Sequence, residues 1–173
     1  MANTISIDKV KTIISYLAEK TDKLYITKLM KLFYYIDFIS YAERSSSITN
    51  DIYYKLPYGP IPSFIKSEID NLVINPTDES GIESQFSDCI TLEEDKDKNG
   101  KIIKNIGKGY NLKDLSEYEL GLINEIIKKL GGKTAKALTN KTHKEKPYLL
   151  TSENSVISYE LAKTLGGRDV LDD

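Results

Sequence analysis

The stretch that decides the fold runs from residue 28 to residue 62. It begins with KLMKLFYYIDF at residues 28–38 and ends with LPYGPIP at residues 56–62. In the first segment apolar residues cover most of the circumference of a helix, which is typical of a helix in the middle of a fold. In the second, Pro60 and Pro62 restrict the residues before them to extended conformations, and Gly59 permits a backbone angle that is costly for other residues. The stretch therefore predicts a central helix from Thr27, a short strand at residues 52–56 and a stiff turn.

The remaining elements follow from periodicity and capping signals. Ser116 and Glu119 have the spacing of a capping box, which predicts a helix that ends at Gly131. Apolar runs on both sides of an acidic segment predict a β-hairpin between residues 89 and 103. Further helices are predicted after Ser6, from Pro62 to Asn75-Pro76, from Thr134 to about His143, and from Ser158 to Leu165.

Length and composition predict one mainly α (α+β) domain. A chain of 173 residues can bury a core of its own, and the pattern predicts a compact single-domain helical bundle of about five or six helices with a small β-hairpin or ribbon. The domain is expected to span residues 1–167, and residues 168–173 are expected to be a flexible polar tail with few contacts. A net charge of -2 gives no global attraction to nucleic acid or to an anionic membrane.

Location is predicted from three features of the sequence. Cys89, the single cysteine, has no partner for a disulfide within the chain, which favours a reducing compartment. The first residues do not have the pattern of a signal peptide, and no stretch approaches the ~20 apolar residues that a bilayer span requires. We therefore expect a cytoplasmic protein without a membrane anchor.

Residue types that carry chemistry are sparse. His143 is the single histidine, and no nucleophile elbow, phosphate-binding loop or set of metal ligands accompanies it. Cys89 lies in an apolar context that does not activate a thiol. The sequence therefore predicts no catalytic residue, no cofactor and no metal, and it favours a binding module over an enzyme.

Two surface signals remain. Tyrosine occurs 12 times, and several tyrosines lie near Gly59, where they could line a recognition groove. The segment 128–146 is rich in lysine and has one acidic residue, Glu145. It can be a landing surface for an acidic partner or RNA, or simply a solvated helix face, which is the favoured interpretation because arginine and stacking aromatics are lacking. Its lysines are Lys128, Lys129, Lys133, Lys136, Lys141, Lys144 and Lys146.

The order of these motifs resembles the Panacea or SocA-like antitoxin domain. That family pairs a K-L-x-K-L-x-Y-Y helix with a downstream Y-G-P-hydrophobic-P segment. The resemblance covers about residues 5–165 and includes I-T at residues 48–49, L-S-E at 115–117, T-H-K-E at 142–145 and I-S-Y at 157–159. One difference is Tyr148, where many family members carry a tryptophan.

The resemblance implies an antitoxin that neutralises a protein toxin, encoded by an adjacent gene, through direct contact. A role as an adaptor that delivers the toxin to a cellular protease stays open. Alternatives are a phage or mobile-element protein that counters a host defence, and a nucleic-acid-binding regulator that uses residues 128–146. A homodimer is also left open.

The candidate partner contacts come from the matching motifs. Lys28 and Lys31 lie three residues apart on one helical face, suited to an acidic partner or to pairing with Asp37 or Glu43. The rigid proline segment and its tyrosines would lose little entropy on binding. The full set of candidates is Lys28, Lys31, Tyr35, Tyr53, Tyr58, Gly59, Pro60, Pro62 and His143.

Overall fold

The computed structural model describes residues 4–74, 83–107 and 111–173. Its α-helices are α1 (Ile7–Lys20), α2 (Ile26–Arg44), α3 (Ser63–Ile74), α4 (Glu117–Leu130), α5 (Ala135–Thr142) and α6 (Lys146–Leu149). Its strands are β1 (Tyr53–Leu56), β2 (Gly59–Pro62), β3 (Ile90–Glu94) and β4 (Lys101–Asn105), and its 3-10 helices are η1 (Leu112–Asp114), η2 (Tyr159–Leu165) and η3 (Gly167–Asp172). The prediction of a mainly α fold with a small β component is confirmed.

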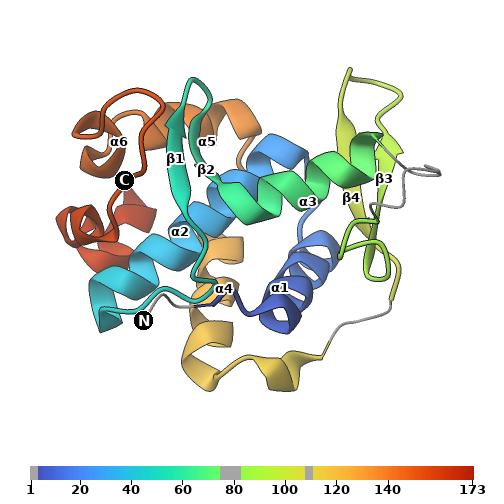
Figure 1. Cartoon of the computed structure of the whole chain (residues 1–173), viewed down its shortest axis with the longest axis horizontal. Coiled ribbons are helices and arrows are strands. Elements are labelled where there is room, and N and C mark those ends of the chain that lie inside the picture. The colour runs from blue at the N-terminus through green and yellow to red at the C-terminus, as the bar shows by residue number, and fades with distance from the viewer. Residues whose placement is uncertain (1–3, 75–82, 108–110) are drawn as a thin grey trace.

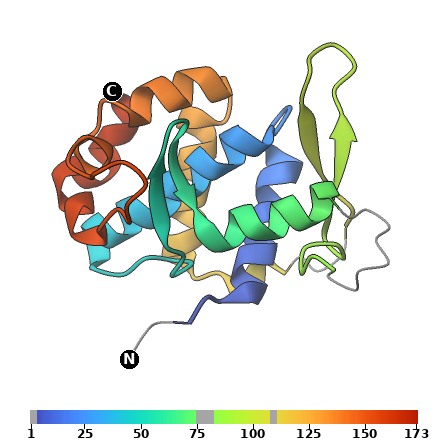
Figure 2. The ribbon, with the colours of Figure 1, turned by 45° about the horizontal axis from the view of Figure 1, so that its top comes forward.

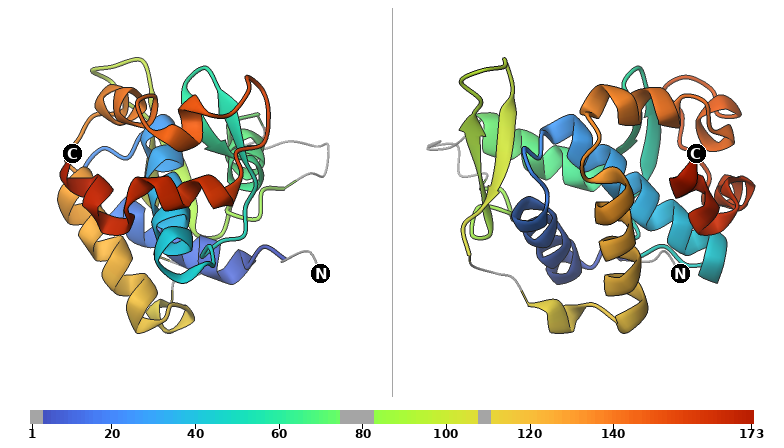
Figure 3. Two further views of the ribbon diagram at one scale, coloured as in Figure 1. Left: turned by 90° about the vertical axis from the view of Figure 1, so that its left-hand side faces the viewer. Right: turned by 180° about the vertical axis from the view of Figure 1, so that it is seen from behind.

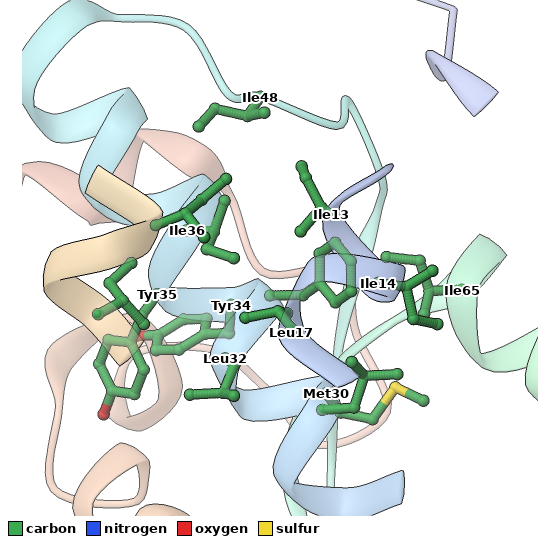
Figure 4. Packing of buried hydrophobic residues seen from close by; sticks show 14 of the residues in the cluster. Ile13, Ile14, Leu17, Met30, Leu32, Tyr34, Tyr35, Ile36, Ile48 and Ile65 are labelled. Atoms are coloured by element: carbon green, nitrogen blue, oxygen red, sulfur yellow. The ribbon is translucent and has the colours of Figure 1, made fainter. Parts of the chain in front are cut away.

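Helix α2 forms the centre of the molecule (Figure 1). Every residue from 28 to 40 on this helix is buried, as the all-round apolar pattern predicts. Side chains of α1, such as Ile13 and Leu17, meet Met30 and Leu32 of α2 in the main apolar cluster (Figure 4). The helix begins at Ile26, one residue before the predicted start.

The predicted proline turn is wrong in one respect, because residues 59–62 form a strand. Strand β2 pairs antiparallel with β1, with Leu56 opposite Gly59 and Tyr53 opposite Pro62, so that Pro57 and Tyr58 make the turn. In an antiparallel pair alternate residues direct their N–H groups away from the partner strand. Pro60 and Pro62 are two residues apart, so both prolines can occupy such positions without losing a ladder hydrogen bond.

The β1–β2 hairpin lies between α3 and the C-terminal helices (Figure 2). Residues 154–157 run along the free edge of β1, where Ile157 N donates to Tyr53 O at 2.8 Å and Asn154 N donates to Lys55 O at 2.9 Å. The hairpin is therefore enclosed on the side of β1 by a segment that is about 100 residues distant in sequence.

The second hairpin and the helix caps agree with the sequence. Strands β3 and β4 pair from Ile90 opposite Asn105 to Glu94 opposite Lys101. The capping box of Ser116 and Glu119 forms with both of its hydrogen bonds, and Thr134 caps α5. Ser6 occupies the N-cap of α1 without a side-chain capping bond. The helix end predicted at Asn75-Pro76 lies outside the described residues.

The C-terminal segment corrects two expectations. The last predicted helix, from Ser158, is a 3-10 helix, and the short helix α6 was not predicted because Pro147 was interpreted only as a helix breaker, whereas it lies in the first turn. Residues 168–173 are not a tail with few contacts. Val170 and Leu171 are buried in η3, and Arg168 forms ion pairs with Glu43 and Glu125. The helices η2 and η3 lie against α2 (Figure 3).

Within the described ranges, no helix has the length and apolar character needed to cross a membrane.

Candidate functional site

The turn end of the β1–β2 hairpin rests on Lys31 of α2. The Lys31 side chain is fully buried, and its Nζ donates a hydrogen bond to Pro60 O at 3.1 Å. Gly59 has a φ of 107°, and a Cβ atom there would lie 2.7 Å from Lys31 Cε and 3.0 Å from Thr142 Oγ1. The motif therefore needs glycine at this position for two reasons, the backbone angle and the close approach of α2 and α5.

Asp37, one helical turn and a half further along α2, anchors the chain before and within β1. Its carboxylate accepts hydrogen bonds from Ile48 N at 2.9 Å, Thr49 N at 2.8 Å, Thr49 Oγ1 at 2.6 Å and the Tyr53 hydroxyl at 2.6 Å. Complete burial raises the pKa of Asp37 to about 6, and these hydrogen bonds oppose the shift. The network fixes the path of the loop that leads into the hairpin.

Glu145 connects α2 to the start of α6. It occupies the N-cap of α6, and its carboxylate accepts hydrogen bonds from the hydroxyls of Tyr34 at 3.1 Å and Tyr35 at 2.6 Å. Burial raises the pKa of Glu145, while the Tyr35 hydroxyl and Lys141 lower it. Tyr34 and Tyr35, the two tyrosines of the K-L-x-K-L-x-Y-Y segment, therefore both donate hydrogen bonds to a carboxylate inside the protein.

His143 and Tyr148 connect the hairpin tip to α5 and α6. The two rings are stacked at 4.4 Å with an interplanar angle of 7°, and the Tyr148 hydroxyl donates to Leu56 O at 3.0 Å. Lys55 Nζ lies 4.5 Å from the centroid of the Tyr148 ring. Burial lowers the pKa of His143, and the charges of Lys31 and Lys55 lower it further. The site holds the hairpin by stacking and hydrogen bonding.

The structure places most of the predicted partner contacts inside the protein. Among them only Tyr58, at 73% exposure, is freely accessible, and His143 is partly buried. Of the two alternatives for these lysines, pairing with Asp37 or Glu43 is wrong, because Lys28 Nζ donates to Gly131 O and Lys31 Nζ to Pro60 O. The buried candidates are Lys28, Lys31, Tyr35, Tyr53, Gly59, Pro60 and Pro62.

Sequence reasoning missed an exposed apolar group around the hairpin. Leu149 and Leu150, directly after the α6 contact with Leu56, are 57% and 65% exposed. Val156, which forms a β-bridge with Tyr54, is 51% exposed. Two adjacent leucines in a polar C-terminal segment were the available signal, but periodicity alone cannot say that both face solvent. We use the term tip surface for these four exposed residues on and around the hairpin, Tyr58, Leu149, Leu150 and Val156.

It also missed Asp51 as a structural cap. The Asp51 carboxylate accepts hydrogen bonds from Phe64 N at 2.9 Å and Ile65 N at 3.0 Å, which satisfies two amides in the first turn of α3. The Tyr159 hydroxyl donates to Asp51 O at 2.6 Å. Asp51 and Tyr159 thus join the hairpin, α3 and η2.

Groups suited to metal or nucleophile chemistry are not gathered at the hairpin. In the residues for which the structure gives positions, no three His, Cys, Asp or Glu side chains lie together as a metal site requires. Cys89 is fully buried, and burial raises the pKa of its thiol.

These features define a mainly α domain in which a central helix holds a β-hairpin through buried polar contacts. The chain belongs to the family described as antitoxin SocA-like, Panacea domain, whose model matches residues 29–148. The match extends from α2 through the hairpin to Tyr148, and it confirms the resemblance seen in the sequence. Comparison with curated proteins gave no match, and comparison with solved structures gave none either. Membership of this family supports an antitoxin-type role.

Proposed function

We propose that this protein neutralises a protein toxin, encoded beside it, by direct contact through the tip surface. The observation that carries the proposal is the exposure of Tyr58, Leu149 and Leu150 next to a hairpin whose turn end is held by Lys31 and Tyr148. Large exposed apolar and aromatic side chains are typical of the centre of protein interfaces. The buried support lowers the entropy that the hairpin loses on binding.

The family match and the burial pattern support two different roles for residues within the segment 28–62. Its buried members, such as Lys31 and Asp37, fix the hairpin, while Tyr58 at the turn is presented to the partner. A single, buried Cys89 favours a reducing compartment, so the interaction is assigned to the cytoplasm. The proposal needs no chemistry by this protein, and its role is binding without catalysis.

The test is co-expression with the product of the adjacent gene. Wild-type protein is expected to relieve the growth arrest and to copurify with the toxin. A triple variant with Tyr58→Ser, Leu149→Ser and Leu150→Ser removes the three most exposed of the four large side chains of the tip surface. It is expected to keep its melting temperature, because all three side chains are exposed, and to lose both rescue and copurification.

The matched control is Ile74→Ser. Ile74 is 72% exposed at the end of α3, which points away from the tip surface toward the β3–β4 hairpin (Figure 1). This variant is expected to neutralise as well as the wild type. Full rescue by the triple variant would contradict the assigned surface, and a harmless neighbouring product would contradict the antitoxin role itself. A fall in toxin level that requires a cellular protease would instead identify the adaptor mode.

A further inference from the structure

Two depressions on the surface meet at Lys133, just before α5. The first, about 320 Å³ in volume, is lined by the lysines Lys133, Lys141 and Lys144, by Ala137 and Asn140, and by the acidic residues Glu145 and Asp173. We call it the Lys141 pocket. The second, which we call the Lys28 pocket, has a volume of about 350 Å³ and is lined by five lysines, Lys23, Lys28, Lys98, Lys133 and Lys136. Lys133 lies between them, so the two pockets form one basic surface along α5.

The positive charge of this surface is poorly compensated. Lys133, Lys136 and Lys144 are exposed, and they make no ion pair within the part of the chain that the structure describes. Lys141 Nζ lies 3.9 Å from Glu145, a carboxylate that already accepts hydrogen bonds from two tyrosines. Lys23 forms ion pairs with Asp95 and Asp97. The two pockets together are lined by seven lysines and by three acidic residues, Asp22, Glu145 and Asp173, so the lining has an excess of ammonium groups.

Lys28 is the deepest cation of this surface. Its side chain is buried, its Nζ donates to the carbonyl of Gly131, and no carboxylate forms an ion pair with it in the described residues. Burial lowers the pKa of Lys28, and the charge of Asp22 opposes that shift. A buried ammonium group without a carboxylate partner is stabilised electrostatically when an anion enters the pocket beside it.

We propose that this surface binds an acidic segment of a protein partner, with one carboxylate in each pocket. The inference rests on the proposed function, because the segment is assigned to the toxin. Helix α5 has 8 residues and is therefore about 12 Å long. An extended peptide covers that distance with about four residues. We therefore expect the partner's acidic segment to have Asp or Glu residues about four positions apart.

Nucleic acid fits this surface less well. Arg44 and Arg168 lie elsewhere, against Tyr118, so no guanidinium is present to bind phosphate in a bidentate manner. The one ring that lines the Lys28 pocket, Tyr25, has its hydroxyl bound to Asp95. Asp22 in the pocket and Asp95 beside it repel a backbone that carries a charge at every nucleotide, whereas a peptide can place uncharged residues next to them.

The surface lies on the other side of α5 from the tip surface, with Thr139 of α5 in contact with the hairpin turn. Thr139 Oγ1 is 3.5 Å from Tyr58 O. The β3–β4 turn, which carries Lys98, lies at the same end of the molecule as α5 (Figures 1 and 3). One partner can therefore cover the tip surface with an apolar patch and reach the basic surface with an acidic extension.

The test measures binding of a fluorescent peptide by polarisation. The probe is an eight-residue peptide with glutamates at its first, second, fifth and sixth positions, and its glutamine counterpart is the control peptide. Wild-type protein is expected to bind the glutamate peptide saturably and to lose affinity as salt is raised from about 50 to 300 mM. Lys133→Glu with Lys144→Glu is expected to weaken binding by about tenfold or more.

Lys104→Glu with Lys113→Glu is the matched control, since it changes the net charge equally at two other exposed lysines. It is expected to bind like the wild type. Equal binding by both variants, or no saturable binding by the wild type, would overturn the inference. Tighter binding of an eight-nucleotide single-stranded RNA, lost in the Lys133/Lys144 variant, would overturn it in favour of nucleic acid. The peptide measurement contains no toxin, so its failure is distinguishable from a failure of the proposed neutralisation.

Discussion

Replacing Lys31 by methionine is expected to stabilise this protein at neutral pH. Lys31 is fully buried, and its one hydrogen-bond acceptor among the described residues is the uncharged carbonyl of Pro60. Burial lowers the pKa of Lys31 from 10.5 to about 7. The unfolded chain therefore keeps the proton between pH 7 and 10.5, whereas the folded protein has released it. Because the unfolded state binds more protons in this window, the free energy of unfolding rises with pH.

The size of the effect follows from the same pKa values. The shift from 10.5 to about 7 makes folding less favourable by about 5 kcal/mol at neutral pH. Methionine fills a similar volume without a charge, and it loses the hydrogen bond to Pro60, which contributes about 1 to 2 kcal/mol. The net expectation for Lys31→Met is a gain of about 3 kcal/mol at pH 7, which shrinks by about 1.4 kcal/mol for each pH unit above that.

Urea unfolding at pH 7.0, 8.0 and 9.0 measures this difference. Burial also lowers the pKa of Lys28, but Lys28 is present in both proteins, so the difference between them isolates Lys31. The range stops below the ordinary pKa of tyrosine, because several buried tyrosines titrate at higher pH. Parallel curves for the two proteins, or a loss of stability in the variant at pH 7, would refute the claim that Lys31 is buried without a compensating anion.

Three further substitutions test the support of the hairpin and one helix cap. Gly59→Ala is expected to lower the free energy of unfolding by about 3 kcal/mol, measured by chemical unfolding, because its Cβ would meet Lys31. Its control, Gly107→Ala, also has a positive φ, 78°, but its Cβ would have nothing within 4 Å, so the expected loss is about 1 kcal/mol. Similar losses in the two variants would reject the steric argument. Asp37→Ala leaves two amides and two hydroxyls without an acceptor and should lower stability by about 3 kcal/mol or more, and a loss under 1 kcal/mol would show that the network relaxes. Ser116→Ala removes the cap of α4 and should lower stability by about 1 kcal/mol; an unchanged thermal midpoint would mean that water replaces the cap.

Local signals predicted the elements that depend on local physics. The capping box at Ser116 requires only residues three positions apart, and the all-round apolar pattern of α2 requires only that helix, so both are confirmed. The pairing of β2 with β1 was missed, because two prolines argue against a strand unless the register is known. That register depends on which N–H groups face the partner, and this is a property of the folded hairpin.

The partner contacts were harder to predict, because burial is decided by distant segments. Lys28 and Lys31 look like surface residues in sequence, since lysine is rarely fully buried. Lys31 is covered by the hairpin and α5, and Lys28 reaches the carbonyl of Gly131, which is 103 residues away. By contrast, the exposure of Leu149 and Leu150 depends on α6, a helix of 4 residues that has too little periodicity to be recognised.

Stability alone does not explain the buried charged groups around α2. Lys31, Asp37 and Glu145 all have pKa values moved by burial in the direction that disfavours the charged form. Apolar residues of similar volume are often neutral or stabilising at such positions. Each group instead fixes a separate part of the support: Lys31 the turn end of the hairpin, Asp37 the loop before β1, and Glu145 the start of α6. We therefore expect Lys31→Met to unfold at higher urea concentration than the wild type and yet to neutralise the toxin less well, because the hairpin has lost its anchor. Undiminished neutralisation by the stabilised variant would show that anchoring of the hairpin by Lys31 is not needed for toxin binding.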